Sequence, residues 1–418
     1  MNGYQLVCFV MKVAFFSPSW PPGTRPNGIT TYCAAVQRCL EAASERPLIL
    51  DMAGAVSEDA DVVPVFAAPR GPLDRVCSKL AFAFWPERAQ WNSRAQVLRA
   101  TAKHIFKARG VELVEIEESF GWSKAITAAP SNERPAVAVR LHGPWFLVGP
   151  ALGVQEDFAY RARVSRELEA IECADGVSAP SQFTLRAVEE RLGHRLRISE
   201  VIPNPIFPPA KEHRWSAAGA CQDRVLFVGR VDRVKGADVV LRAFGQIHKA
   251  RPATRLVFAG PDAGYIDEAG RAMTQGELVS QTLVEPSRSA VEFLGAQTPA
   301  QVAELRPTAA VTIVASRYET FPYTLLESLN AGSPTVTSSG SGMSELFEEG
   351  VTAIGFPPGD HAALAQRVLD LLGDRGFAER LGRAAQHSVA LRCGPEVVTS
   401  RLIRFYERVL ASKNAMNR

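Results

Sequence analysis

An α/β fold with two doubly wound, parallel-sheet domains is the fold class that this sequence predicts. Short apolar runs alternate with longer segments of helical period from one end of the chain to the other, which is the pattern of βαβ units. The length of 418 residues is comfortable for two domains of about 200 residues each. Residues 203–223 are rich in proline and lack periodicity, so we interpret them as the linker between the two domains.

The expected strands are short runs of apolar and β-branched residues. Those before the linker cover 12–17, 47–52, 61–66, 111–117, 136–142, 176–181 and 199–204. Those after it cover 224–229, 255–260, 291–295, 310–316, 333–339 and 352–356. Two such domains facing each other would bring the carboxyl ends of both sheets to one cleft, where ligands of open α/β sheets bind. Chemistry is therefore expected in the turns that follow strands.

Beyond residue 360 the sequence predicts helices. Amphipathic patterns cover 361–374, 375–392 and 395–410 in succession. The last of them carries an apolar stripe at spacings of three and four, formed by Val397, Val398, Leu402, Ile403, Phe405, Tyr406, Val409 and Leu410. This stripe must be buried, and the preceding two helices already compete for the faces of the second sheet.

Composition excludes several classes of protein. Apolar residues make up 46% of the chain and charged residues 22%, as in soluble globular enzymes, and a net charge of +3 is too small to favour a nucleic-acid partner. No run approaches the ~20 apolar residues of a membrane span. Lys12 interrupts the apolar opening, which makes it a poor signal peptide, so residues 1–10 are expected to be an upstream extension or a mis-assigned start. The scattered cysteines, without a CxxC, favour a reducing cytoplasm over a disulfide framework or zinc site.

Two cations follow the first strand of the second domain. In VLFVGRVDRVKG (225–236) a buried strand ends at Gly229, Arg230 and Lys235 follow, and a helix opens at Gly236. A departing diphosphate needs cations at such a place, because negative charge builds up on it as the sugar bond breaks. The alternative is that both side chains are solvated surface residues.

Two glutamates flank the start of a predicted helix in SRYETFPYTLLESLNAG (316–332). Glu319 lies in the loop after a strand and Glu327 on the helix, with seven residues between them. Pro322 suits the first turn, and Gly332 ends the helix. The NH groups of this helix N-terminus offer an anion site, and a carboxylate one or two turns in can accept from both hydroxyls of a ribose. The alternative is an ordinary loop glutamate and an ordinary helix-surface glutamate.

Together these motifs resemble retaining GT-B glycosyltransferases of family 4. The family's G-R-x-x-x-x-K-G element, its Glu–seven residues–Glu element and the phenylalanine after the first Glu are matched by Gly229, Arg230, Lys235, Gly236, Glu319, Glu327 and Phe321. Thr320 stands where the family often has Gly. The resemblance extends to FFSPSWPPGTRPNGITTY, RLHG and DGVSAPS…VIPNPI, and so covers most of the chain.

The resemblance implies roles for individual residues. Arg230 and Lys235 would hold the donor diphosphate, Glu327 the ribose, and Glu319 the hydroxyls of the transferred sugar. Gly28, in the loop after the first strand, would let the backbone approach the donor, and His142 would face the sugar, although a lone histidine is more often structural. The expected catalytic residues are Arg230, Lys235, Glu319 and His142, and the expected donor-binding residues are Gly28, Gly229, Phe321, Thr324, Leu325 and Glu327.

The resemblance also implies a whole reaction and architecture. It predicts an N-terminal acceptor-side domain (1–205), a C-terminal donor domain (206–394) and a crossover helix (395–418) that packs back on the N-terminal domain. The reaction would move a hexose from a nucleotide-diphosphate sugar to the hydroxyl of a saccharide or lipid-linked acceptor, with retention, in synthesis of a cell-surface polysaccharide or glycolipid. No cofactor or metal ion is expected, because cations and a helix dipole would stabilise the leaving group. A sugar-nucleotide epimerase, a phosphorylase of the same architecture and a non-catalytic sugar-nucleotide binding protein remain alternatives.

Two competing motifs are disfavoured. Asp59-Ala60-Asp61 spells the DxD that holds a metal in the other glycosyltransferase fold, GT-A, but it precedes a strand here instead of following one. No GxGxxG opens a helix after the first strand, which removes the fingerprint of a dinucleotide-dependent dehydrogenase.

The segment 70–109 is basic and aromatic. Its cations outnumber its acids, and Phe82, Phe84, Trp85 and Trp91 are interleaved with them. Such a helical stretch can lie on an anionic membrane surface or bind an acidic acceptor, so peripheral contact with the inner face of the membrane is one expectation for this otherwise cytoplasmic protein. The alternative is a solvated helix face whose aromatic side chains lie in the core.

Overall fold

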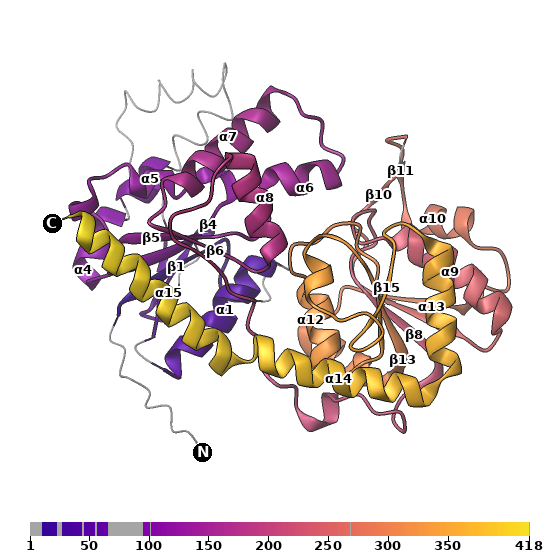
Figure 1. The fold of residues 1–418 in the computed structure, drawn as a ribbon. Helices are drawn as coiled ribbons and strands as arrows, with labels where there is room; N and C mark the ends of the chain where they lie inside the picture. Colours follow the sequence, from indigo (N-terminus) through magenta and orange to yellow (C-terminus); the bar gives the residue numbers. More distant parts are fainter. Residues whose placement is uncertain are drawn as a thin grey trace. The chain divides into compact units, whose positions relative to one another are not determined.

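The computed structural model describes residues 11–22, 27–43, 46–54, 57–65, 95–100, 102–267 and 269–417. The chain forms two compact units (Figure 1). The first consists of Met1–Pro205 together with Pro395–Arg418, and the second of Ile206–Gly394. None of the helices in these ranges is long and apolar enough to cross a membrane.

The first unit is built on a seven-stranded parallel sheet of order β3-β2-β1-β4-β5-β6-β7. Its strands are β1 (Val13–Ser17), β2 (Leu48–Asp51), β3 (Val62–Pro64), β4 (Leu113–Glu117), β5 (Ala136–Arg140), β6 (Gly176–Ala179) and β7 (Ser199–Val201). The order reverses beside β1, so the topological switch point lies between β1 and β4. All five residues of β1 and of β5 are buried, as expected of central parallel strands covered on both faces.

Three of the helices described in the first unit begin at a residue whose side chain caps them. The unit contains α1 (Gly28–Glu41), α4 (Lys107–Arg109), α5 (Lys124–Thr127), α6 (Trp145–Ala151), α7 (Phe158–Glu172), α8 (Gln182–Leu192) and α15 (Pro395–Met416). Asn27 accepts from the Ile29 amide at 2.8 Å and Asp157 from the Tyr160 amide at 2.8 Å. Such caps satisfy NH groups that the first turn of a helix leaves without partners.

The terminal helix α15 packs within the first unit, against α1 and β5 (Figure 1). Val398, Leu402, Phe405 and Val409 on its apolar stripe are fully buried. The helix approaches β6 closely, because a Cβ added to Gly176 would lie 2.4 Å from Val409.

The second unit is built on a six-stranded parallel sheet of order β12-β9-β8-β13-β14-β15. Its strands are β8 (Cys221–Val228), β9 (Arg255–Ala259), β12 (Val291–Gly295), β13 (Ala309–Val314), β14 (Thr335–Ser338) and β15 (Ile354–Phe356). An antiparallel hairpin of β10 (Tyr265–Ile266) and β11 (Ala272–Met273) follows β9. The hairpin was not predicted, because two-residue strands are too short to show a period.

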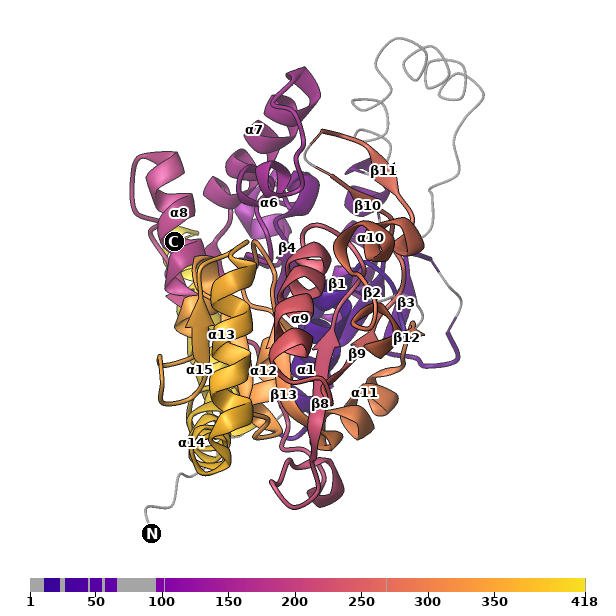
Figure 2. The same ribbon diagram turned by 90° about the vertical axis from the view of Figure 1, so that its right-hand side faces the viewer.

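Helices cover both faces of this sheet. They are α9 (Ala237–Ala250), α10 (Gln275–Thr282), α11 (Pro299–Leu305), α12 (Tyr323–Asn330), α13 (His361–Gly373) and α14 (Arg375–Cys393). Figure 1 shows α9 and α13 on one side of β8 and β13 and α12 on the other, and Figure 2 shows α9 beside α13. Val240, Phe244 and Phe258 belong to the apolar core on the α9 side, whereas Leu325 and Leu329 belong to the core under α12.

The expected linker is shorter than predicted. Strand β8 begins at Cys221 instead of at residue 224, and residues 206–220 are part of the second unit. Trp215 attaches this stretch to the unit, since its indole NH donates to the Ala309 carbonyl at 2.8 Å and its amide to the Ala331 carbonyl at 2.8 Å. The prolines explain why this stretch shows neither a helical nor a strand period, but the stretch is nevertheless packed on the second unit.

Candidate functional site

The loop between β8 and α9 is organised around the carboxylate of Asp232. One carboxylate oxygen lies 2.6 Å from Arg230 Nε, and the other accepts from the Lys235 amide at 2.7 Å. Asp232 thus contacts both residues that supply the predicted cations of the loop. It binds the side chain of Arg230 and the backbone amide of Lys235. Sequence reasoning missed this residue, although an aspartate in the turn before a helix, here five residues before α9 begins, is a recognisable turn signal.

Glycine is required where this loop meets its neighbours. Gly236 precedes α9 with φ 76, and a Cβ there would lie 2.1 Å from the Ala315 carbonyl oxygen. A Cβ on Gly260, after β9, would lie 1.9 Å from the Gly229 carbonyl oxygen. The turns after β8, β9 and β13 therefore pack backbone against backbone.

A buried ion pair joins the loop after β13 to the start of α9. Arg317 Nη1 and Nη2 lie 2.8 and 2.7 Å from the two carboxylate oxygens of Asp238. Burial alone would raise the pKa of Asp238, but the hydrogen bonds and charge of Arg317 outweigh it and lower that pKa. Arg317 also donates to the Arg233 carbonyl at 2.6 Å, so one guanidinium connects both loops that carry the predicted motifs.

The structure brings Lys235 and Glu319 into contact. The ammonium group of Lys235 forms an ion pair with the Glu319 carboxylate, and both side chains are about four-fifths buried. The loop around Glu319 is fixed by its own amide, which donates to Ser341 Oγ at 3.3 Å, and by the Ser316 hydroxyl, which donates to Glu319 Oε1 at 3.3 Å. Two residues 84 positions apart in sequence therefore form one site.

Helix α12 begins at Tyr323, four residues after Glu319. Pro322 is its N-cap and no side chain caps the helix among the residues that the structure describes. Phe321 and Leu325 are buried in the core under the helix, so Leu325 can offer only its backbone to a ligand. Glu327 lies one turn further on, and its carboxylate Oε2 is 2.6 Å from Nη2 of Arg306.

The predicted site residues of the first unit lie at the amino end of α1 and after β5. Gly28 was expected in the loop after the first strand, but it is the first residue of α1, which Asn27 caps. A Cβ on Gly28 would meet nothing within 4 Å. His142 packs edge-on against the Tyr32 ring at 5.0 Å. Burial, and then the charge of Arg140, hold the pKa of His142 well below its usual range, so its imidazole is neutral at neutral pH.

Buried carboxylates hold the backbone around His142. The Glu118 carboxylate accepts from the amides of His142 at 2.8 Å and Gly143 at 2.6 Å. Burial, and then the charge of Glu167, raise the pKa of Glu118 to about 7. Burial, and then the charge of Glu118, raise the pKa of Glu117 to about 8. Sequence reasoning did not single out these glutamates.

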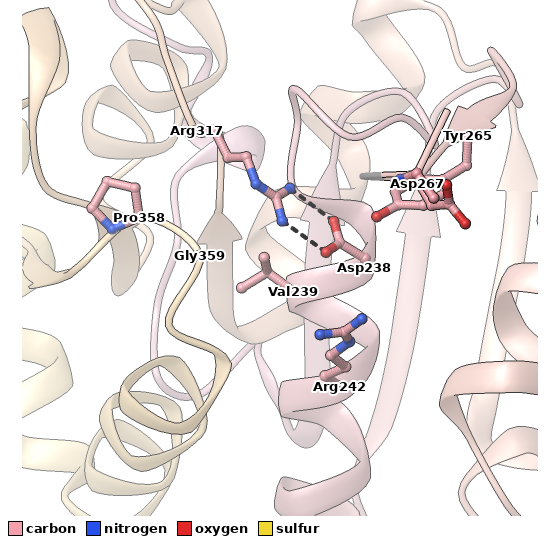
Figure 3. A pocket seen from close by; sticks show the side chains of 9 residues that line it. Asp238, Val239, Arg242, Tyr265, Asp267, Arg317, Pro358 and Gly359 are labelled. Carbon is pink, nitrogen blue, oxygen red and sulfur yellow. Dashed lines mark hydrogen bonds and ion pairs between the residues drawn. The ribbon is translucent and has the colours of Figure 1, made fainter. Parts of the chain in front are cut away.

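A pocket of about 530 Å³ opens in the second unit on the α9 side (Figure 3). It is lined by residues that include Asp238, Arg242, Tyr265, Asp267 and Arg317. Arg317 and Asp238 face each other in its wall as the ion pair that joins the two loops (Figure 3). Its lining includes none of the predicted site residues.

The DxD motif is engaged by an arginine, and most of the basic segment falls outside the described residues. Asp59 and Asp61 both lie within ion-pair distance of Arg46, at 2.7 and 3.6 Å. Across the described ranges no group of three or more His, Cys, Asp or Glu side chains is arranged to hold a metal ion. Of the basic segment 70–109, residues 70–94 and 101 lie outside the described residues, as do the four aromatic side chains on which the membrane expectation depends.

Comparison with known proteins finds similarity to glycosyltransferases in the second unit. Residues 212–388 match the family model described as "Glycosyl transferases group 1". The chain is 30% identical to glycogen synthase of Mycobacterium tuberculosis (strain CDC 1551 / Oshkosh) over 232 residues, and this aligned region covers 53% of each chain. It is 27% identical over 252 residues to D-inositol 3-phosphate glycosyltransferase of Nocardiopsis dassonvillei, covering 55% of each. The chain thus spans about half the length of the curated relatives that it matches.

Solved structures resemble the whole chain. Sucrose-phosphate synthase from Thermosynechococcus elongatus matches with a TM-score of 0.73 at 20% identity, covering 96% of this chain and all of that one. HepE of Anabaena, solved in complex with UDP-glucose, matches with a TM-score of 0.67 at 17% identity, covering 95% of this chain and 99% of that one. These matches confirm the predicted two-domain GT-B fold, and the family model confirms the resemblance to glycosyltransferases.

Proposed function

We propose that this protein is a glycosyltransferase that moves a sugar from a nucleoside-diphosphate sugar to a hydroxyl acceptor. The observation that carries the proposal is the Lys235–Glu319 ion pair, with Arg230 in the same loop as Lys235 and the start of α12 four residues after Glu319. A cationic loop, a helix N-terminus and two carboxylates match the chemical groups of such a donor. The family match over residues 212–388 supports the same reaction class.

The diphosphate is the part of the donor that Arg230, Lys235 and the NH groups of Thr324 and Leu325 can hold. Charge develops on its bridging oxygen as the sugar bond breaks, so cations and a helix N-terminus stabilise the transition state more than the ground state. A Cβ on Gly229 would lie 2.9 Å from the Phe227 ring, and the ring of Phe321 is buried in the core under α12, so both positions can offer only their backbone to the diphosphate. This stabilisation needs no metal ion, and we propose that transfer is metal-independent.

The two glutamates suit the two sugars of the donor. Glu319, beside the leaving group, can accept from hydroxyls of the transferred sugar once the diphosphate takes over Lys235. Glu327, one turn into α12, can accept from the ribose. In the first unit, the open approach at Gly28 and the neutral imidazole of His142 suit contacts with an uncharged sugar.

The stereochemistry that we propose is retention. The described residues around Glu319 present cations and hydrogen-bond donors, and Glu319 itself is paired with Lys235 and is not a free nucleophile. Departure and attack on the same face of the sugar, with the diphosphate taking the acceptor proton, is consistent with this arrangement. We further propose a saccharide or lipid-linked acceptor in the synthesis of a cell-surface polysaccharide or glycolipid.

Replacement of Lys235 tests the proposal. A thermal-shift panel of nucleoside diphosphates and their sugars first identifies the donor, because a ligand that binds the folded state raises the Tm. Lys235→Ala should then lower kcat by about 100–1000-fold at saturating donor while the Tm falls little. Lys249→Ala, at the exposed far end of α9, is the matched control and should retain full activity.

Three results would overturn parts of the proposal. Near-normal kcat in Lys235→Ala would remove that lysine from the leaving-group site. Loss of transfer in EDTA with recovery in Mg²⁺ would contradict the metal-free reaction. Formation of a new nucleotide sugar without acceptor would instead identify an epimerase.

A further inference from the structure

A buried arginine that no predicted motif contains lies against Glu327. Arg306 opens the short 3₁₀ helix Arg306–Thr308 between α11 and β13. Its residue surface is 4% exposed, and its Nη2 lies 2.6 Å from Glu327 Oε2. The side chain of Glu327 remains 37% exposed, so Arg306 contacts its carboxylate from the protein side without burying the glutamate.

Stability alone does not account for this arginine. Within the described residues its guanidinium has one acidic partner, Glu327, and its Nε is buried without a hydrogen-bond partner. Taking an arginine out of water for one partly exposed partner is expensive, and apolar side chains of similar volume often serve a core equally well or better. The arrangement is instead suited to holding the glutamate in one orientation.

Arg306 changes what Glu327 can do for a ligand. A glutamate on a helix surface rotates freely and loses that freedom when it binds a diol. Here Oε2 is already engaged by Arg306, which fixes the carboxylate plane and leaves Oε1 available.

We propose that Arg306 is a positioning residue that orients the Glu327 carboxylate toward the ribose hydroxyls of a nucleoside diphosphate. The inference rests on the proposed function, because it takes Glu327 as the ribose ligand. In this role Arg306 itself touches neither substrate nor reacting atoms. By orienting Glu327, Arg306 increases the affinity for the ribose and so favours a ribose over a deoxyribose in the donor.

A chemical comparison separates this role from a structural one. Calorimetry on the full chain uses whichever of UDP, GDP, ADP and CDP binds most tightly, together with its 2′,3′-dideoxy counterpart. In the wild type the ribose form should bind about tenfold more tightly, because its hydroxyls donate to a charged acceptor. Arg306→Gln should remove most of that ratio by weakening the ribose form while leaving the dideoxy form unchanged. Arg306→Lys should recover part of it.

Matched variants keep the result interpretable. Arg224→Gln removes a guanidinium that donates to Thr308 in the same 3₁₀ turn at 2.9 Å, without contacting Glu327, and should keep the wild-type ratio. Glu327→Gln should remove the ratio as Arg306→Gln does. If Arg306→Gln does not fold, Arg306→Lys decides, because it retains charge but not the fork geometry and must lower the ratio measurably.

The outcomes distinguish the inference from the function on which it rests. If Arg306→Gln weakens the binding of the ribose and dideoxy nucleotides equally, or leaves the ratio of their affinities unchanged, the positioning role of Arg306 is overturned. A lowered ratio in Glu327→Gln would then still support Glu327 as the ribose ligand. An unchanged ratio in Glu327→Gln would instead remove Glu327 from the ribose. A wild type that binds none of the four nucleotides would overturn both proposals.

Discussion

At the scale of single residues, Asp232 links two cations that the motif shows only as neighbours in sequence. Its carboxylate receives Arg230 on one oxygen and the Lys235 amide on the other. The turn therefore presents both cations before a donor arrives, so less ordering remains to be done in the complex. The geometry of the two cationic residues, Arg230 and Lys235, therefore depends on Asp232, a negatively charged residue that is not itself expected to bind the donor.

Asp232→Ala should lower kcat/KM by up to about 100-fold, because small displacements of charged groups are costly in a preorganised site. Asp232→Asn keeps an acceptor for the Lys235 amide and should retain more activity than the alanine variant. Steady-state kinetics with the identified donor measure both. Asp360→Ala, which removes a similar acceptor from the cap of α13, is the control and should lower the Tm without changing kcat/KM. Identical kinetics in Asp232→Ala and wild type would contradict this role.

Glu117, the last residue of β4, and the adjacent Glu118 give the first unit a pH-dependent stability. The pKa of Glu117 is raised by burial, and then by Glu118, to about 8, above its ordinary value of 4.5. The folded state therefore binds more protons than the unfolded state between these values. The stabilisation is fully present below about pH 4.5 and is lost as the pH rises through about 8. Because Glu117 and Glu118 interact, they titrate as a pair.

Glu117→Gln should remove much of this dependence. At pH 5 the free energy of unfolding should be close to that of the wild type, whereas at pH 8.5 the variant should be more stable by on the order of 2 kcal/mol. Urea titrations at both pH values measure the difference. Glu156→Gln, in the exposed loop before α7, serves as the control. If the free energy of unfolding of the wild type instead increased from pH 5 to 8.5 relative to that of Glu117→Gln, the prediction would be contradicted.

At the scale of elements, the sequence period and the turn residues predict where strands and helices lie, but they do not predict which side chains pair. The strands from β1 to β9 and from β12 to β15 all fall at or near predicted runs, because buried parallel strands are continuous apolar segments. Helix α12 starts where Pro322 predicts it. Arg306, Asp238 and Arg317 were missed, because each acts through a partner 21 to 79 residues away and no local spacing reports such a pair. The roles of Lys235, Glu319 and Glu327 remain predictions.

The Arg317–Asp238 ion pair should hold the two motif loops together as one element. Arg317→Met leaves a buried carboxylate without its main partner and should cost about 3–5 kcal/mol of stability. Adding Asp238→Asn should recover part of that loss, since the unpaired charge is then gone. Chemical denaturation of both single variants and the double variant measures the coupling. Additive losses in the double variant would show that the pair is not coupled.

At the scale of the whole molecule, the first unit is made from two separate parts of the chain. Helix α15 returns to the first unit, and its Tyr406 hydroxyl donates to Glu115 Oε2 at 2.9 Å. Tyr32 on α1 donates to the other oxygen of the same buried carboxylate at 2.8 Å. Burial raises the pKa of Glu115, although Arg140 and both tyrosines oppose this. The last helix is thus tied to the centre of the first sheet by a polar contact as well as by its apolar stripe.

Removal of residues 395–418 should therefore destabilise the first unit and spare the second. The truncation uncovers β5, β6 and α1 and takes one of two hydroxyl donors from a buried carboxylate, which alone costs about 1–3 kcal/mol. Hydrogen exchange read by mass spectrometry should show faster exchange in peptides from β4, β5 and α1, and unchanged exchange in peptides from β8, β13 and α13. Tyr406→Phe isolates the polar part and should produce a smaller effect confined to the same peptides. Equal loss of protection in both units, or none in the first, would contradict the assignment of α15 to the first unit's core.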